Sequence, residues 1–202
     1  MVLIFCYFIY HILFNLHNLN EELITLINKK NNHVKKFDQI NCDHCQKEIF
    51  QDMVYLFNHY LRIKQAVHGI NDFYKWRVLA LVFGASGVTG SSLVFIIAVR
   101  SEESLLYYTI YITSILCYYV IAEAGEDVRS KSEMLFINAQ QVNWYYWNKE
   151  NRNLLLMFLL VTQKPLELNC HGFLVQSREM LLKIAKIIHG FLTYYQTVSS
   201  TN

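Results

Sequence analysis

The last apolar segment of the chain carries polar residues that could contact a passing ion. They recur at steps of four, three, four, three and four residues and therefore share one face of a helix: Glu179, Lys183, Lys186, Gly190, Thr193 and Thr197. The other faces of that helix are apolar, so it has lipid or protein on most sides and water on one. This polar stripe predicts either a helix that lines a pore or an amphipathic helix that lies on a membrane surface.

Metal and enzyme chemistry have little support in the sequence. The stretch CDHC, with Cys42, His44 and Cys45, has a spacing that could begin a zinc site. A tetrahedral zinc site needs four ligands, however, and neither a second C-x-x-C pair nor an H-x-x-x-H pair follows. Motifs for a nucleophile elbow, a phosphate loop or paired catalytic carboxylates are also missing. We therefore expect no metal ion, no cofactor and no enzymatic activity.

The composition indicates a membrane protein. Of the 202 residues, 53% are hydrophobic and 15% aromatic, and the mean hydropathy is positive. The formal charge of +2 comes without a basic block, which argues against a nucleic-acid partner. The five cysteines are scattered and partly lie inside apolar runs, so they indicate no disulfide framework.

Three apolar segments could enter a membrane before the final helix. Residues 78–99 and 105–122 carry no charge, and a helix of about 20 apolar residues crosses ~30 Å of hydrocarbon. With the short loop 100–104 they predict a membrane hairpin. Residues 1–16 read as the inner end of another spanning helix, which continues without a break into the next residues and is cut at its start.

Charge then predicts the topology. The polar stretches 17–77 and 123–172 hold most of the lysines and arginines, which places both in the cytoplasm and the loop 100–104 outside. We expect a long cytoplasmic helix in the first stretch. In the second, Pro165 should end a short helix near Thr162 or Gln163, with Gly172 in the following turn. The final helix, 173–198, would then cross outward and leave an extracellular tail, 199–202.

Several positions near the carboxyl end resemble the signature of insect odorant receptors. The matching residues are Gly125, Trp144 with Tyr145, Gln163-Lys164-Pro165-Leu166, Ser177 and, conservatively, Gly190-Phe191-Leu192. The stretches VHGINDFYKW and ILFNLHNLNEELITL are similar to cytoplasmic helices of the same family. The resemblance covers nearly the whole chain and corresponds to the carboxyl-terminal half of a full family member.

The resemblance implies an all-α helical membrane protein, a truncated odorant receptor fold with a long cytoplasmic helical anchor region. It implies a subunit of a tetrameric cation channel in the plasma membrane of a sensory neuron dendrite, usually assembled with an olfactory co-receptor. Such a channel opens when a small volatile odorant binds within the membrane. A full family member is longer and has seven spans, so we expect a fragment that begins within the fourth span.

The resemblance also suggests ligand and gate residues. The family's odorant pocket lies in the outer half of the membrane, where this chain has Tyr107, Tyr108 and Tyr111. A tyrosine offers an apolar face and one hydroxyl, which suits a small, mostly apolar molecule. Alternatively these rings, Tyr107 above all, form an aromatic belt at the membrane interface. Tyr194 aligns with the family's apolar gate and joins the expected pore-lining residues: Lys186, Gly190, Thr193 and Thr197.

Two other functions remain open. The chain could be a non-conducting membrane protein that joins co-receptor subunits through its cytoplasmic helices, expected at Ile49–Trp76 and Ser132–Trp147. It could also be a relative of gustatory receptors, although that family's terminal Thr-Tyr followed by Gln-Phe is not reproduced after Thr193-Tyr194.

Overall fold

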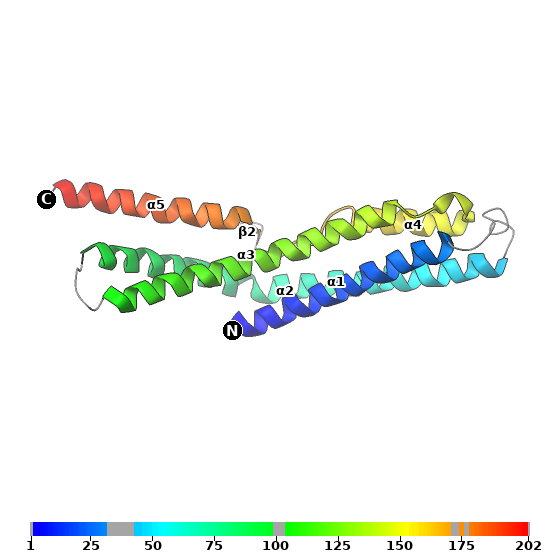
Figure 1. Ribbon diagram of the computed structural model, residues 1–202, viewed down its shortest axis with the longest axis horizontal. Coiled ribbons are helices and arrows are strands. Elements are labelled where there is room, and N and C mark those ends of the chain that lie inside the picture. Colours follow the sequence, from blue (N-terminus) through cyan, green and yellow to red (C-terminus); the bar gives the residue numbers. More distant parts are fainter. Residues whose placement is uncertain (1, 32–42, 99–103, 171–173, 176–177, 202) are drawn as a thin grey trace. The chain divides into compact units, whose positions relative to one another are not determined.

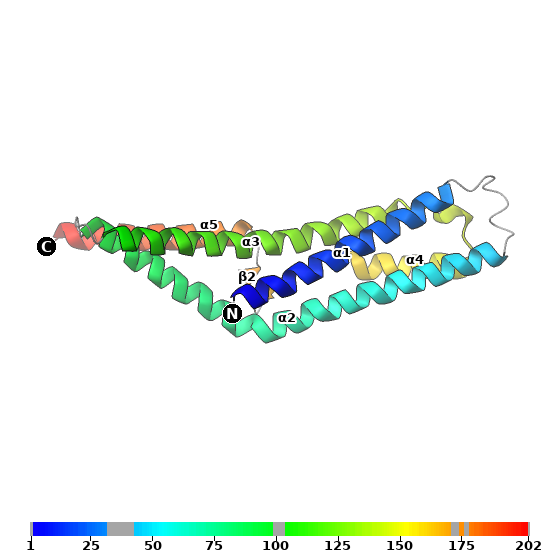
Figure 2. The ribbon, with the colours of Figure 1, turned by 60° about the horizontal axis from the view of Figure 1, so that its bottom comes forward.

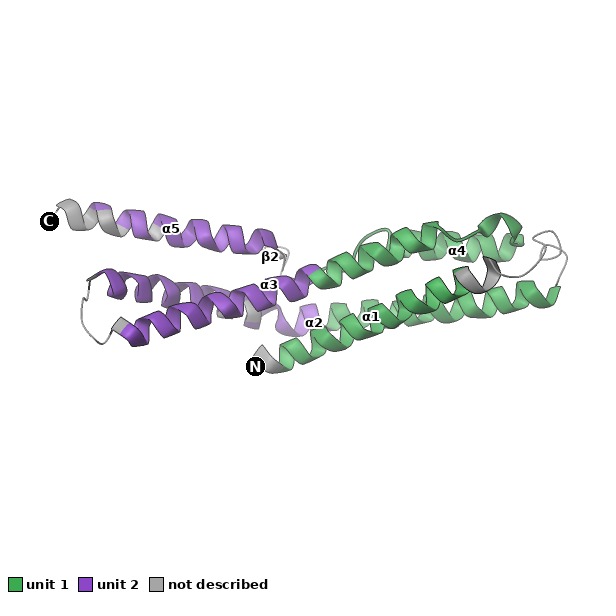
Figure 3. Ribbon diagram, viewed as in Figure 1, with its two compact units in different colours: residues 1–69, 127–167 green, residues 70–126, 168–202 purple. Residues whose placement is uncertain are grey.

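The chain is seen in a computed structural model that describes residues 2–31, 43–98, 104–170, 174–175 and 178–201. In order, the elements are α1 (Val2–Asn31), α2 (Asp43–Ala98), α3 (Ser104–Gln140), the 3-10 turn η1 (Trp144–Tyr146), α4 (Lys149–Thr162), β1 (Asn169–Cys170), β2 (Leu174–Val175) and α5 (Arg178–Thr201) (Figure 1). The predicted helical fold class is confirmed. The chain divides into two compact units, residues 1–69 with 127–167 and residues 70–126 with 168–202 (Figure 3).

Unit 1 is a bundle in which each helix buries a row of side chains spaced alternately four and three residues apart. On α1 the buried residues are Phe5, Ile9, Ile12, Leu16, Leu19, Leu23 and Leu26, and on α2 they are Ile49, Met53, Leu56, Tyr60, Ile63 and Val67. The last part of α3 and α4 follow the same spacing, with Leu135 and Phe158 fully buried. This period keeps one seam of each helix facing its neighbours, as in other helical bundles. Figure 2 shows α1 alongside the first part of α2.

Several polar groups inside unit 1 are paired across helices. Asn138 Nδ2 donates to Asn20 Oδ1 at 2.7 Å and joins α3 to α1. Gln46 on α2 donates through Nε2 to the Tyr146 carbonyl at 3.0 Å, and its Oε1 accepts from the Asn148 backbone N–H at 3.0 Å. Because buried polar groups cost free energy unless they are bonded, these pairs fix one register among the helices.

The short helix before Pro165 ends where the sequence predicted. Asn148 caps the start of α4 by accepting from the Asn151 N–H at 2.8 Å, and the helix stops at Thr162. The chain is then held at Leu166, whose backbone N–H donates to the buried Ser132 Oγ at 3.0 Å. Because Pro165 has no backbone N–H to donate, the hydrogen bond that joins the segment after α4 to α3 comes from the next residue, Leu166.

Unit 2 contains the hairpin predicted at 78–99 and 105–122, together with α5. It exposes many large apolar side chains, among them Phe83, Phe95, Leu105, Ile112 and Leu116. Among the described residues, one helix has the length and apolar composition to cross a membrane, Leu105–Gln140; α2 is a second candidate if Asp43–Arg77 and Val82–Ile97 are taken together. Apolar side chains that point outward are what a lipid-facing helix requires.

Two local predictions differ from the structure. The helix expected over Ser132–Trp147 ends at Gln140, and η1 follows after a turn. The reason is the Gln46 side chain, which holds the Tyr146 carbonyl and the Asn148 N–H in a non-helical path. The second difference is the start of the final helix, expected from residue 173: Leu174–Val175 form β2, which pairs antiparallel with β1 (Asn169 with Val175, Cys170 with Leu174), and α5 begins at Arg178. The turn assigned to Gly172 lies outside the described residues.

Candidate functional site

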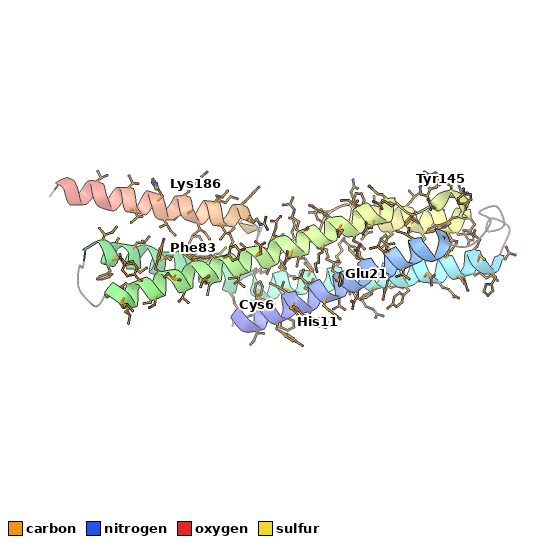
Figure 4. All side chains as sticks on the ribbon, viewed as in Figure 1. Cys6, His11, Glu21, Phe83, Tyr145 and Lys186 are labelled. Atoms are coloured by element: carbon orange, nitrogen blue, oxygen red, sulfur yellow. The ribbon has the colours of Figure 1, made fainter. Side chains whose placement is uncertain are left out.

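The helix α5 is held to unit 2 by a narrow face. Met180 and Ile184, one turn apart, are buried to 1% and 5% exposure. The stripe residues on α5 are exposed: Glu179, Lys183, Lys186, Gly190, Thr193 and Thr197. Lys186 is labelled in Figure 4. The stripe therefore occupies solvent-accessible positions in this chain. A helix that lines a pore and a helix that lies on a membrane surface both require such positions. The assignment to a pore stays a prediction.

The threonine hydroxyls of the stripe donate hydrogen bonds within their own helix. Thr193 Oγ1 donates to the His189 carbonyl at 2.9 Å, and Thr197 Oγ1 donates to the Thr193 carbonyl at 2.9 Å. A hydroxyl has one hydrogen and two lone pairs, so a threonine that gives its hydrogen to its own helix keeps acceptor capacity. Acceptor oxygens stabilise a hydrated cation and not an anion.

Tyr194, next to the stripe, and Lys186, within it, would control passage differently. Tyr194, at 69% exposure, places a large ring beside Thr193. Lys186 is two helical turns earlier and carries a positive charge on the same exposed face. A ring narrows a conduction path, while a fixed positive charge repels the cations that the threonines attract. If α5 lines a pore, its inner end is therefore less favourable for cations than its outer end.

The three candidate ligand tyrosines lie in different surroundings. Tyr107 stacks on Phe95 of α2, with ring centroids 4.9 Å apart and the planes 7° from parallel. Tyr108 is 48% exposed, and Tyr111 is half-buried. The structure thus brings Tyr107 into the hairpin's own packing and leaves Tyr108 open. Ligand contact by any of the three remains a prediction.

A fourth tyrosine on α3, Tyr118, is buried in unit 2 and was not singled out by the sequence. Its hydroxyl donates to the Val82 carbonyl on α2 at 3.0 Å and lies near the hydroxyls of Thr89 and Ser86. Tyr118 lies seven residues after Tyr111 and so shares its helix face; this spacing is the signal that could have found it. The small side chains of α2 permit this close approach.

Unit 1 has a cavity of about 430 Å³ between α1 and α2, and none of the candidate tyrosines lines it. Its walls include three carboxylates, Glu21, Glu22 and Asp52. Glu22 Oε2 lies 3.6 Å from His59 Nδ1. No group of three or more potential metal ligands occurs within the described part of the chain, and Cys42 of the CDHC stretch lies outside it.

One end of unit 1 and the surface of α4 expose apolar side chains. Trp144 and Tyr145 stack at 4.4 Å and are both exposed; Tyr145 is labelled in Figure 4. On α4, Leu156, Met157 and Leu160 are each more than half exposed. These side chains lie at four- and three-residue spacing on the face opposite Leu155 and Phe158, which is the arrangement of a helix that meets a partner.

Comparison with known proteins adds one finding. The family model described as 7tm odorant receptor matches residues 1–188 of the chain. A search of curated proteins found no match. The matched region includes unit 1, unit 2 as far as residue 188, and the α5 stripe as far as Lys186.

Proposed function

The chain belongs to the 7tm odorant receptor family, and on that premise we propose that it is an odorant-binding subunit of a ligand-gated cation channel. The subunit would span the plasma membrane several times and act in the sense of smell together with an olfactory co-receptor. The observation that supports conduction most directly is the exposed stripe of α5, on which the Thr193 and Thr197 hydroxyls lie.

The proposed conduction path runs along the stripe. A hydrated cation would meet the hydroxyl oxygens of Thr197 and Thr193 near the outer end and the Tyr194 ring beside them. In this account Tyr194 narrows the path, and Lys186 sets an electrostatic barrier nearer the inner end. Rearrangement of α5 would change which of these side chains faces the path.

The proposed odorant site lies along the outer part of α3. Tyr108 is the main candidate because its ring is open, and Tyr111 follows three residues later on the same side of the helix. Tyr107 would act indirectly, because its ring already stacks on Phe95. A volatile with an apolar body and one hydrogen-bonding group matches the chemistry of a tyrosine pair.

The proposed contact with co-receptor subunits uses the exposed apolar residues of unit 1. Trp144 and Tyr145 are large aromatic side chains of the kind that anchor protein interfaces, and Leu156 and Leu160 extend an apolar surface along α4. This surface also favours a second candidate function, a non-conducting subunit that associates with co-receptors, because the assembly surface and the polar stripe lie in different units.

Co-expression distinguishes the two candidates. The full chain would be expressed with an olfactory co-receptor in a cell line, and whole-cell currents would be recorded during exposure to a panel of volatile esters, alcohols and terpenes. The channel proposal expects a current that needs this chain and that, in Tyr108→Ala at equal surface amount, requires a higher concentration of the volatile. Co-purification without any current from the panel would favour the non-conducting candidate.

A further inference from the structure

The first residue of α5 is joined to α3 by an ion pair. Arg178 Nη2 donates to Glu123 Oε1 at 2.6 Å, and Arg178 Nε donates to Glu123 Oε2 at 3.3 Å. Both carboxylate oxygens are used by one guanidinium, which fixes the relative orientation of the two side chains as well as their distance. The two residues are 55 positions apart in the sequence and both belong to unit 2.

The position of Arg178 is unfavourable for its own helix. The unpaired N–H groups at a helix amino terminus carry partial positive charge, so an arginine at the first helical position is repelled and an acidic residue is preferred there. Glu179 supplies such an acid in the first turn of α5. A cation that breaks this local rule points to a role beyond helix stability, and the structure gives it a specific partner on another helix.

The position of Glu123 on α3 also points to a role beyond helix stability. Glu123 directly follows the segment predicted to span the membrane, 105–122, on which Tyr108 and Tyr111 lie. The same continuous helix, α3, therefore carries the proposed odorant site and the acid that holds α5. After Arg178, the next buried residues of α5 are Met180 and Ile184, and most of the following described side chains are exposed. The ion pair thus lies where α5 is attached to its own unit.

We propose that Glu123 and Arg178 form a positioning pair that holds the first turn of α5 against α3, so that a displacement of α3 moves α5. The transmission of an odorant signal by this pair rests on the proposed channel function, whereas the mechanical attachment does not. Neither residue contacts odorant or ion in this account. The pair acts by keeping α5 in step with the helix that carries the ligand tyrosines.

A simple interfacial anchor is the competing interpretation of Arg178. Long cationic side chains at the end of a membrane helix reach toward lipid headgroups, and a lysine does this as well as an arginine. A positioning pair requires Glu123 and also requires the planar guanidinium, which a lysine cannot replace at a two-point contact. The variants Arg178→Lys and Glu123→Gln therefore separate the two interpretations.

The attachment is tested by amide hydrogen exchange of the full chain in lipid nanodiscs. We expect Glu123→Gln and Arg178→Lys each to speed exchange in residues 178–184 by roughly two- to fivefold, the range for an ion pair that is largely exposed. The double replacement Glu123→Arg with Arg178→Glu should restore slow exchange. Asp127→Asn, an exposed acid one turn further along α3, is the matched control and should leave exchange unchanged. Unchanged exchange in Glu123→Gln, or an equal effect of Asp127→Asn, would overturn the proposal.

The signalling step is tested in cells that co-express the olfactory co-receptor. With the first panel volatile that evokes a current, Glu123→Gln should raise the half-maximal concentration by roughly two- to fivefold at unchanged surface amount, and the charge-exchanged double variant should lower it again. An altered exchange rate with an unaltered half-maximal concentration would refute the signalling role. If no volatile evokes a current from the unmodified chain, the channel proposal fails, while the exchange result still decides the attachment.

Discussion

The side-chain amide of Asn151 on α4 donates to Gln46 on α2 twice, to the backbone carbonyl and to Oε1, each at 2.9 Å. Both residues are buried, and Gln46 also binds the turn between α3 and α4. A single amide pair thus connects three segments of unit 1. It explains why α3 stops at Gln140 and why α4 begins where it does.

Replacing Asn151 should destabilise unit 1. Asn151→Ala removes two buried hydrogen bonds to Gln46, whose Oε1 keeps the bond from the Asn148 N–H, and we expect a loss of about 1–3 kcal/mol in the free energy of unfolding for the two bonds together. Asn153→Ala, an exposed position on the same helix, is the control. Thermal unfolding of the full chain in detergent measures both. Equal unfolding temperatures for the two variants would contradict the role of the pair.

Stability should fall at high pH because of Tyr60. Burial raises the pKa of its hydroxyl above the ordinary value, and a hydrogen bond with Ser132 offsets part of that rise. The folded state then keeps the proton that the unfolded state releases near pH 10, so the associated stability is present below about pH 10 and is lost as pH rises further. In Tyr60→Phe this loss should be absent. Denaturation curves of both proteins between neutral pH and pH 11 check the prediction, which parallel curves would contradict.

Substitutions of Tyr107 and Tyr108 should have different effects. Tyr107→Ala removes the stack on Phe95 and should lower the amount of folded protein at the cell surface, whereas Tyr107→Phe keeps the stack and should be neutral. Tyr108→Ala should leave the surface amount unchanged and raise the half-maximal odorant concentration by roughly tenfold, the equivalent of ~1.4 kcal/mol of contact energy. Surface labelling combined with concentration-response recordings measures both effects. The opposite pattern would move the ligand site toward Tyr107.

Much of this fold could be predicted from residue spacing, because periodic burial is local information. Three features depend only on neighbours within a few turns: the buried row from Leu16 to Leu26, the end of α4 near Thr162 and the apolar hairpin. The end of α3 at Gln140 could not, because it depends on Gln46, about a hundred residues earlier in the chain. The β1–β2 pair is too short to show an alternating pattern.

Part of the candidate site could also be predicted from the sequence, and part could not. The polar stripe of α5 could be predicted because five polar residues and Gly190 repeat along one helix face. The stack of Tyr107 on Phe95 and the bond from Tyr118 to the Val82 carbonyl require the hairpin to pack in one register, which composition does not specify. The ion pair of Glu123 with Arg178 likewise joins residues that no local pattern connects.

Lys186 should oppose cation flow if the stripe lines the conduction path. Lys186→Gln removes a fixed positive charge from that path, so the inward cation current at equal surface amount should increase, by roughly two- to tenfold for about 0.5–1.4 kcal/mol of relieved repulsion. Lys164→Gln, an exposed lysine in the segment after α4, is the matched control and should have no effect. A current that is the same for both variants would place Lys186 away from the path.

The most direct measurement is the reactivity of single cysteines placed around α5 during current recording with the co-receptor. Cysteines at Thr193 and Thr197 should react quickly with a water-soluble thiol reagent and change the current, because those positions face the proposed path. Cysteines at Ile188 and Leu192, which are half-buried, should react far more slowly. If cysteines on all faces react equally and the current never changes, α5 is a surface helix and the central claim is wrong.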